Sequence, residues 1–191
     1  MNKNIILCGV GGQGTVLASK LIAATAMEKG LEVMSAETIG MAQKGGSVFS
    51  HVRIGENLYS PMIGKAEADM IIAFEPAEAV RMLPYLKEKG IVVVNPQSVI
   101  PVNAVLNEEI YNAGEMLAYL EKKVERLIMP DCAKACKELG SFRVVNMVLL
   151  GVALGMGELP ITKEDVIDAI HKKVKPQFHE INEKALMYYG N

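Results

Sequence analysis

The sequence predicts an α/β fold in which helices cover both faces of a mostly parallel sheet and the C-terminal segment is helical. Short apolar runs, typical of buried strands, alternate with helix-period segments along most of the 191 residues. The first apolar run passes through a glycine-rich turn directly into a helical pattern. From residue 142 onward every regular segment reads as a helix. We therefore expect one compact domain that covers residues 1–191.

The strands are expected where apolar residues run together or alternate with polar ones. They are an apolar run from residue 5 and the segments 32–38, 47–54, 69–74, 91–94 and 126–129. The runs at 69–74 and 91–94 are almost continuously apolar, which indicates strands buried on both faces. Residues 39–46 read as a long loop, 58–65 as irregular, and 97–112 as ambiguous.

The helices are expected where apolar residues recur with helical spacing between start and stop signals. They are residues 15–29, 75–85, 115–123, 131–139, a long helix from 142, and the segments 162–174 and 177–189. Pro76 suits the first position of its helix, and Asp131 and Ser141 suit the capping position before theirs. Thr162 and Asp165 form a capping box.

Composition argues against several classes of protein. The formal net charge is −2 and no run of Lys or Arg stands out, so nucleic-acid binding is not expected. The longest apolar stretch, 144–157, is shorter than the about 20 residues that cross a bilayer, so no membrane association is expected. Three cysteines and no signal peptide predict a reduced, cytoplasmic protein.

The glycine-rich turn is the first candidate site. Gly9, Gly11 and Gly14 fit the G-x-G-x-x-G pattern of Rossmann-like nucleotide-binding domains. The helix that follows points unpaired N–H groups and the positive end of its dipole at the turn, which favours an anion such as phosphate. The alternative is a turn that binds nothing. Gln13 is unusual in a dinucleotide-binding loop, and its amide can both donate and accept hydrogen bonds.

Glu37 leaves a dinucleotide-binding interpretation open. In that class of fold an acidic residue about 20 residues beyond the glycines binds the ribose. Glu37 stands at the end of the second predicted strand, where such a residue is needed. However, the chain offers no distinct site for hydride transfer. A separate partner would have to supply it.

The loop 39–46 and the strand after it form a second candidate. Strand alternation places Ser47, Phe49, His51 and Arg53 on one face. Lys44, His51 and Arg53 would form part of an anion site or a subunit interface; the alternative is a solvated strand face.

No catalytic or metal-binding motif is evident in the chain. Cys132 and Cys136 have helical i, i+4 spacing, but an iron–sulfur cluster needs four ligands, so we expect structural cysteines. His171 and His179 lack further ligands nearby, and no nucleophile elbow or Walker motif appears. We therefore expect no catalytic residue and no metal site in this chain.

Several motifs together resemble the gamma-type subunit of 2-oxoacid:ferredoxin oxidoreductases. They are GVGGQG at 9–14, QKGGS at 43–47, HVRIG at 51–55, GSFRVVNM at 140–147, LG at 150–151, NEKA at 182–185 and Gly190. The resemblance covers nearly the whole chain and, within the family, is strongest to the small (beta) subunit of indolepyruvate:ferredoxin oxidoreductase. The gamma subunits for pyruvate or 2-oxoglutarate are the alternatives. Lys44 stands where the family often has Arg, a change that loses bidentate pairing.

The resemblance implies a share in oxidative decarboxylation, in which a 2-oxoacid and coenzyme A give an acyl-CoA, CO2 and reduced ferredoxin. Thiamine diphosphate, Mg2+ and iron–sulfur clusters would belong to a larger catalytic partner subunit, with ferredoxin as acceptor. The glycine loop would contact the phosphates of coenzyme A or support the partner, and Asn146 would lie in a packing or subunit contact. The candidate contacts are Gly9, Gly11, Gly12, Gln13, Gly14, Thr15, Lys44, Gly45 and Gly46. A self-contained NAD-type dinucleotide-binding protein and an empty scaffold are the other hypotheses.

Overall fold

The computed structural model describes residues 2–39, 46–99 and 111–190 and confirms the α/β class. Its strands are β1 (Lys3–Val10), β2 (Glu32–Ile39), β3 (Ser47–Gly55), β4 (Ala68–Ala73), β5 (Leu86–Val94) and β6 (Arg126–Ile128). Its α-helices are α1 (Thr15–Glu28), α2 (Pro76–Met82), α4 (Ala113–Lys123), α5 (Cys132–Glu138), α6 (Val145–Gly155), α7 (Lys163–Lys173) and α8 (His179–Leu186). Short 3-10 turns are η1 (Leu83–Tyr85), η2 (Phe142–Val144) and η3 (Pro176–Phe178).

The six strands form one sheet in the order β2-β3-β1-β4-β5-β6. Strands β1, β4, β5 and β6 pair in parallel, and β3 pairs antiparallel with both β1 and β2. Among the strands of the described residues, β3 alone is therefore antiparallel to the others. This confirms the mostly parallel sheet and adds that an antiparallel strand separates β2 from β1.

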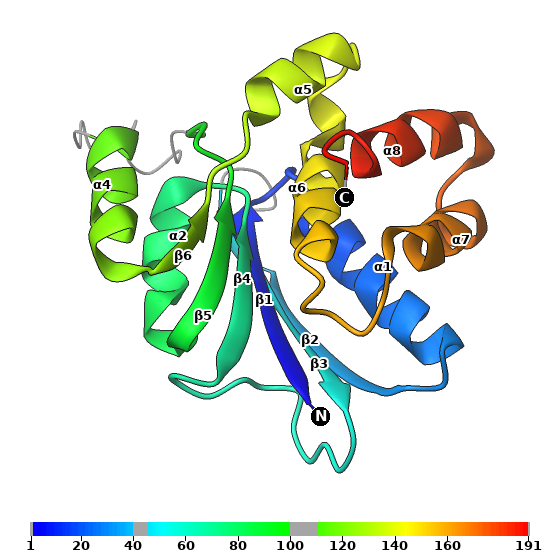
Figure 1. The fold of residues 1–191 in the computed structure, drawn as a ribbon, viewed down its shortest axis with the longest axis horizontal. Coiled ribbons are helices and arrows are strands. Elements are labelled where there is room, and N and C mark those ends of the chain that lie inside the picture. Colours follow the sequence, from blue (N-terminus) through cyan, green and yellow to red (C-terminus); the bar gives the residue numbers. More distant parts are fainter. Residues whose placement is uncertain (1, 40–45, 100–110, 191) are drawn as a thin grey trace.

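Two apolar cores lie on opposite faces of the sheet because successive strand side chains point to opposite sides. Ile5 and Leu7 of β1 face one core with α1, α5, α6, α7 and α8. Ile6 and Cys8 face the other core, which α2 and α4 complete. Figure 1 shows the two helical layers on either side of the sheet, with the helical C-terminal segment over α1.

The capping predictions are confirmed by hydrogen bonds. Asp131 accepts from the Lys134 N–H, and Thr162 and Asp165 form the reciprocal capping box. Ser141 caps the short turn η2 instead of α6, which begins only at Val145. Main-chain groups at these starts are thus satisfied by nearby side chains, as the local sequence predicted.

Two predicted boundaries are wrong. Strand β5 begins at Leu86 rather than at residue 91, because its first residues are polar and partly exposed and carry no burial signal. The last helix was expected over 177–189, but it begins with the 3-10 turn η3 at Pro176 and its α-helical part ends at Leu186. The loop 39–46 and the ambiguous stretch 97–112 lie largely outside the described residues.

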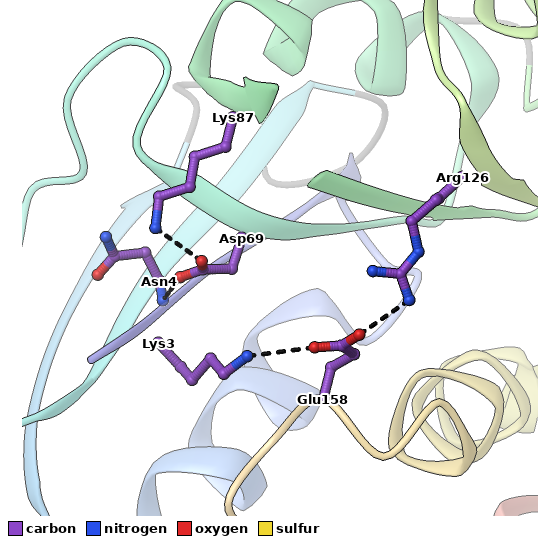
Figure 2. Close-up of polar contacts among 6 residues, drawn as sticks. All are labelled: Lys3, Asn4, Asp69, Lys87, Arg126 and Glu158. Atoms are coloured by element: carbon purple, nitrogen blue, oxygen red, sulfur yellow. Dashed lines mark hydrogen bonds and ion pairs between the residues drawn. The ribbon is translucent and has the colours of Figure 1, made fainter. Parts of the chain in front are cut away.

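Ion pairs link the strands of the sheet near their amino-terminal ends (Figure 2). Glu158, between α6 and α7, pairs with Lys3 of β1 at 3.3 Å and with Arg126 of β6 at 2.8 Å. These bonds lower the pKa of Glu158. Lys87 pairs with Asp69 at 2.6 Å, and Asp69 also accepts from the backbone N–H of Asn4. Two ion-paired groups therefore tie strands β1, β4, β5 and β6 together at this edge.

The described helices include none that is long and apolar enough to cross a membrane.

Candidate functional site

The glycine-rich turn lies at the carboxyl end of the sheet, where the chain changes faces. Helix α1, which follows β1, packs on one face, and α2, which follows β4, packs on the other. Strands β1 and β4 are neighbours in the sheet. In open α/β sheets, ligands bind in the crevice that such a reversal leaves outside the carboxyl ends of the strands. The predicted loop thus stands where this architecture places ligand sites.

The glycines of the turn are required by backbone geometry and by close approach. Gly12 and Gly14 have φ of +104° and +83°, which favour glycine. A Cβ on Gly9 would lie 2.7 Å from Oε1 of Gln13 and 2.9 Å from Cβ of Phe74. The positive φ of Gly12 and Gly14 and the close contacts at Gly9 account for these three glycines without a ligand. A Cβ on Gly12, in contrast, would meet nothing within 4 Å, so that corner of the turn is open.

Gln13 holds the turn between two strands. Its Oε1 accepts from the Val10 N–H at 2.7 Å, and its Nε2 donates to the Phe74 carbonyl at 3.0 Å. The side chain therefore joins the end of β1 to the end of β4. Both ends of the amide have protein partners, which accounts physically for a glutamine at this unusual position.

Two distant motifs of the sequence meet at the turn. Asn146, at the start of α6, is buried, and its Nδ2 lies 3.5 Å from the Gly14 carbonyl oxygen. Gly46, which directly precedes β3, contacts a different residue of the turn. Its carbonyl accepts from the Gly11 N–H at 2.9 Å. Three predicted segments therefore converge here. Lys44 and Gly45 lie outside the described residues.

The start of α1 carries an unpaired hydroxyl. Gly14 is the capping residue of α1, and no side chain of the described residues bonds to the first N–H groups of this helix. Thr15, its first residue, is buried, and its Oγ1 has no hydrogen-bond partner among the described residues. A buried hydroxyl without a partner costs about 1–3 kcal/mol. An uncapped helix end beside such a hydroxyl is suited to an oxyanion.

Three hollows surround the turn. One, of about 330 Å³, is lined by the turn itself together with Thr15 and Val48. A second, of about 280 Å³, lies between Gly12, Asn95 and Phe142. The third, of about 510 Å³, lies between the first turn of α1 and the segment around η3, and its lining is mainly apolar. Phosphate-sized and ring-sized groups could both be accommodated here.

Arg143 is the one charged residue that lines any of these three hollows among the described residues, and it lines two of them. It is exposed, and its guanidinium makes no hydrogen bond or ion pair with the described residues. Sequence reasoning did not single out Arg143 or Asn95. The signal for Asn95 was its place directly after a buried strand. Arg143 stands within the GSFRVVNM motif at 140–147, but only the fold shows that it lies near the turn.

His51 and Arg53 lie away from the turn. His51 is buried, and its Nδ1 accepts from the Ile63 N–H at 2.9 Å. Burial lowers its pKa, so the ring is neutral at pH 7. Arg53 donates to the carbonyls of Ser60 and Met62. The two side chains hold the irregular segment that follows β3, and an interface role for them stays a prediction.

The position of Glu37 does not support binding of a dinucleotide in the usual way. Strand β3 lies between β2 and β1, so Glu37 is two strands from the strand that carries the glycine turn. Neighbouring strands are about 4.8 Å apart, which puts it about 10 Å from β1 across the sheet, about 5 Å farther than in a fold where the second strand adjoins the first. Its Oε1 lies 3.4 Å from the hydroxyl of Ser19.

The cysteines are buried thiols. Burial raises the pKa of Cys132 to about 12 and also raises the pKa of Cys136. Thiols that stay protonated are poor metal ligands. Within the described part of the chain, no three His, Cys, Asp or Glu side chains are grouped as a metal site requires.

Comparison with known proteins agrees with these observations. The family model described as pyruvate ferredoxin/flavodoxin oxidoreductase matches residues 4–188. The indolepyruvate oxidoreductase subunit IorB of Archaeoglobus fulgidus is 38% identical, over 97% of this chain and 92% of that protein. A common gamma subunit of the pyruvate/ketoisovalerate oxidoreductases of Pyrococcus abyssi is 29% identical, over 93% of this chain and 89% of that protein.

Solved structures share the fold. The pyruvate oxidoreductase subunit PORC of Thermotoga maritima matches with a TM-score of 0.70 and 22% identity, over 98% of this chain and 94% of that one. The 2-oxoglutarate:ferredoxin oxidoreductase of Magnetococcus marinus matches with a TM-score of 0.71 and 22% identity, over 98% of this chain but 30% of that one. This chain therefore belongs to the pyruvate ferredoxin/flavodoxin oxidoreductase family, as a gamma-type subunit of a 2-oxoacid:ferredoxin oxidoreductase.

Proposed function

We propose that this chain is the small subunit of an indolepyruvate:ferredoxin oxidoreductase and that its glycine-rich turn binds a phosphate group of coenzyme A. The choice of substrate is supported by the 38% identity to an indolepyruvate oxidoreductase subunit over nearly the full length of both chains. The reaction converts the 2-oxoacid and coenzyme A to an acyl-CoA, CO2 and reduced ferredoxin. Thiamine diphosphate, Mg2+ and iron–sulfur clusters belong to a larger cytoplasmic partner subunit, which carries the carbanion and electron-transfer chemistry.

The observation that best supports a phosphate site is the Thr15 hydroxyl, which has no partner among the described residues and lies at the uncapped start of α1. A phosphate oxygen there would accept from this hydroxyl and from the first N–H groups of the helix. Gly12 leaves the space open, and none of the described residues that line the hollow carries a carboxylate. The role of this chain is thus to hold coenzyme A while the partner performs the chemistry.

The complex is tested by anaerobic purification of the chain with its partners from its own cells. We expect iron, thiamine and coenzyme A-dependent dye reduction in the eluate, with a higher kcat/KM for indolepyruvate than for pyruvate or 2-oxoglutarate. A higher kcat/KM for pyruvate or 2-oxoglutarate would assign the chain to those gamma subunits. A chain that elutes without partner, iron and thiamine and whose Tm rises with NAD would be a dinucleotide-binding protein instead.

The phosphate site is tested by Thr15→Val in the assembled complex. Removing an unpaired buried hydroxyl should leave the stability unchanged or slightly higher. The KM for coenzyme A should rise about tenfold, since a hydrogen bond to a charged group contributes about 1.5–3 kcal/mol. Thr25→Val is the matched control, because Thr25 has the same buried, unpaired hydroxyl on the same helix but lies ten residues, about 15 Å, further along. Equal KM values for both variants and the wild type would reject the site.

A further inference from the structure

We infer that the segment 58–63, between β3 and β4, is a docking surface that places Tyr59 and Met62 in an apolar pocket of the larger catalytic subunit. The inference rests on the proposed function, which supplies this partner. It concerns the end of the sheet opposite the glycine turn. Figure 1 shows the chain after β3 projecting beyond the sheet beside the N-terminus.

The segment exposes two large apolar side chains. Tyr59 is 90% exposed and Met62 is 50% exposed. The six residues read Leu-Tyr-Ser-Pro-Met-Ile and include no charged residue. Glu56 and Lys65, which are both exposed, flank the segment. Tyr and Met are enriched at the centres of protein–protein interfaces, charged residues are depleted there, and the rim is polar. The segment has this composition.

Side chains of the sheet hold the segment in place. Arg53 of β3 donates to the carbonyls of Ser60 at 3.1 Å and Met62 at 3.3 Å. The buried His51 accepts from the Ile63 N–H at 2.9 Å. The Met62 N–H donates to the Ser60 Oγ at 3.1 Å, a further bond within the segment. A surface that is already ordered loses less conformational entropy on binding, so the segment is preorganised for docking.

Buried residues at both ends of the segment leave its middle outside. Leu58 and Ile63 are buried, and Ile63 belongs to the core beneath α2. Pro61 restricts the backbone between them. Tyr59 therefore projects from an anchored support. An aromatic side chain that enters a desolvated pocket from such a support is the commonest kind of interface hot spot.

The helical layer opposite α1 is centred on the other half of the sheet. Helix α2 packs over β1, β4 and β5, and α4 packs on α2. Strands β3 and β2 continue the sheet beyond β1. Met34 and Ala36 of β2 pair with Arg53 and His51 and share their face, opposite the core that contains α1. A partner that covers the segment can therefore extend along β2 and β3.

Strand β3 connects the segment with the glycine turn. It begins at Ser47, directly after Gly46, whose carbonyl contacts the turn, and it ends at Gly55. A strand of nine residues is about 27 Å long, so a partner along β3 would span about this distance between the turn and the segment. Docking here would therefore leave contacts at the turn itself unchanged.

The proposed reaction decides which partner covers this surface. The catalytic subunit has to bring its reacting groups to the coenzyme A at the turn, and from there it can follow β2 and β3 to the segment. A second copy of this chain has no such group to bring. The fold of this chain makes up 30% of the matching Magnetococcus marinus chain, so there it forms part of a much longer chain. The occupant is therefore the larger subunit.

The test follows dissociation of the purified complex on dilution, by analytical ultracentrifugation under anaerobic conditions. We expect Tyr59→Ser to raise the Kd between the subunits about 30-fold, the size of a hot spot, and Met62→Ser about fivefold. Tyr119→Ser on α4 and Met27→Ser on α1 are matched controls, because they remove exposed residues of the same kinds. Both should leave the Kd unchanged.

Two further measurements exclude indirect effects. Tyr59 and Met62 are exposed, so their variants should keep the Tm of the wild-type chain. At concentrations at which the complex is intact, the KM for coenzyme A should also equal that of the wild type, because the turn is not altered. A weaker complex with normal Tm and KM places the loss at the docking surface.

The outcomes separate this inference from the proposed function. If the Tyr59→Ser and Met62→Ser complexes dissociate like the wild type, the docking surface is rejected while the proposed function stands. If the wild-type chain purifies without a larger subunit, both are rejected. If the isolated chain is a dimer that Tyr59→Ser converts to a monomer, while the complex keeps its Kd, the occupant is a second copy and the inference is wrong.

Discussion

Gly14, at the start of α1, combines a positive φ with a close side-chain contact. A Cβ there would lie 2.4 Å from Nδ2 of Asn146, and φ is +83°. Gly30 has a similar φ of +76°, but a Cβ on it would meet nothing within 4 Å. Comparing alanine substitutions at these two glycines therefore distinguishes the free-energy cost of backbone strain from the cost of a steric clash.

We predict that Gly14→Ala destabilises the protein much more than Gly30→Ala. Strain at positive φ costs about 1–2 kcal/mol in both variants. The clash with the buried Asn146 adds about 1–3 kcal/mol, as overpacking does. Urea unfolding of the purified variants measures the difference. Equal losses would mean that Asn146 moves aside freely and does not position the turn.

The buried imidazole of His51 makes stability depend on pH. Its folded pKa is lowered, so the unfolded chain binds more protons than the folded one once the pH falls below about 6.5. The contribution of neutral His51 is thus fully present above the unfolded pKa and is lost as the pH falls below it. The lost interaction is the hydrogen bond from the Ile63 N–H.

We predict that His51→Gln flattens this dependence. Glutamine keeps an acceptor for the Ile63 N–H but does not titrate. The free energy of unfolding, measured in urea at pH 7.5, 6.5 and 5.5, should fall more steeply in the wild type than in the variant. Parallel curves would show that His51 does not contribute, since the other two histidines are the same in both proteins.

At the scale of elements, the C-terminal helix α8 sits against α6 through a close backbone contact. A Cβ on Gly151, in the middle of α6, would lie 2.0 Å from the carbonyl oxygen of Leu186, the last residue of α8. Lys163 of α7 holds the chain just beyond, donating to the Tyr189 carbonyl at 2.6 Å. The C-terminal segment is therefore positioned by a glycine.

We predict that Gly151→Ala displaces α8 and lowers the stability of the protein by about 3 kcal/mol. Gly155→Ala on the same helix is the control. Its Cβ would have only ordinary contacts, from 3.6 Å to Lys163, and alanine is the better helix former. Thermal unfolding measures both variants. A Gly151→Ala protein with normal Tm would show that the two helices can separate without cost.

For the whole molecule, the two apolar cores share one sheet and should unfold together. Leu150 is fully buried on the α1 face and Leu120 on the α2 face. We predict that Leu150→Ala and Leu120→Ala each cost about 2–5 kcal/mol and shift a single transition without changing its slope in urea. Circular dichroism and tyrosine fluorescence should give the same midpoint. Two separate transitions in either variant would show that the two cores unfold independently.

Most of the fold could be predicted from local patterns. The runs at 69–74 and 91–94 matched β4 and the buried part of β5, because strands covered on both faces must be apolar throughout. Thr162 and Asp165 marked the start of α7, because capping groups bond within one turn. The polar start of β5 escaped prediction, since exposed strand residues carry no burial signal.

The candidate site could be predicted only in part. The glycine turn was evident because its residues are consecutive and because Gly9, Gly12 and Gly14 need an unusual backbone or a close contact. Arg143 and Asn95 were not, because only the packing of distant elements brings them to the turn. His51 and Arg53 were placed correctly on one strand face, yet their hydrogen bonds go to a segment that the sequence did not connect with them.

The sequence by itself determined the class of fold, the order of the elements, the glycine turn and, through combined motifs, the family. These depend on periodicity, capping and turn geometry, which act over a few residues. Only the tertiary structure decided that β3 separates β2 from β1, which moves Glu37 away from the turn. It also decided that Asn146, 132 residues from Gly14, and Arg143 beside it close the site. Such contacts arise from how whole elements pack, and no local pattern encodes which distant residues will meet.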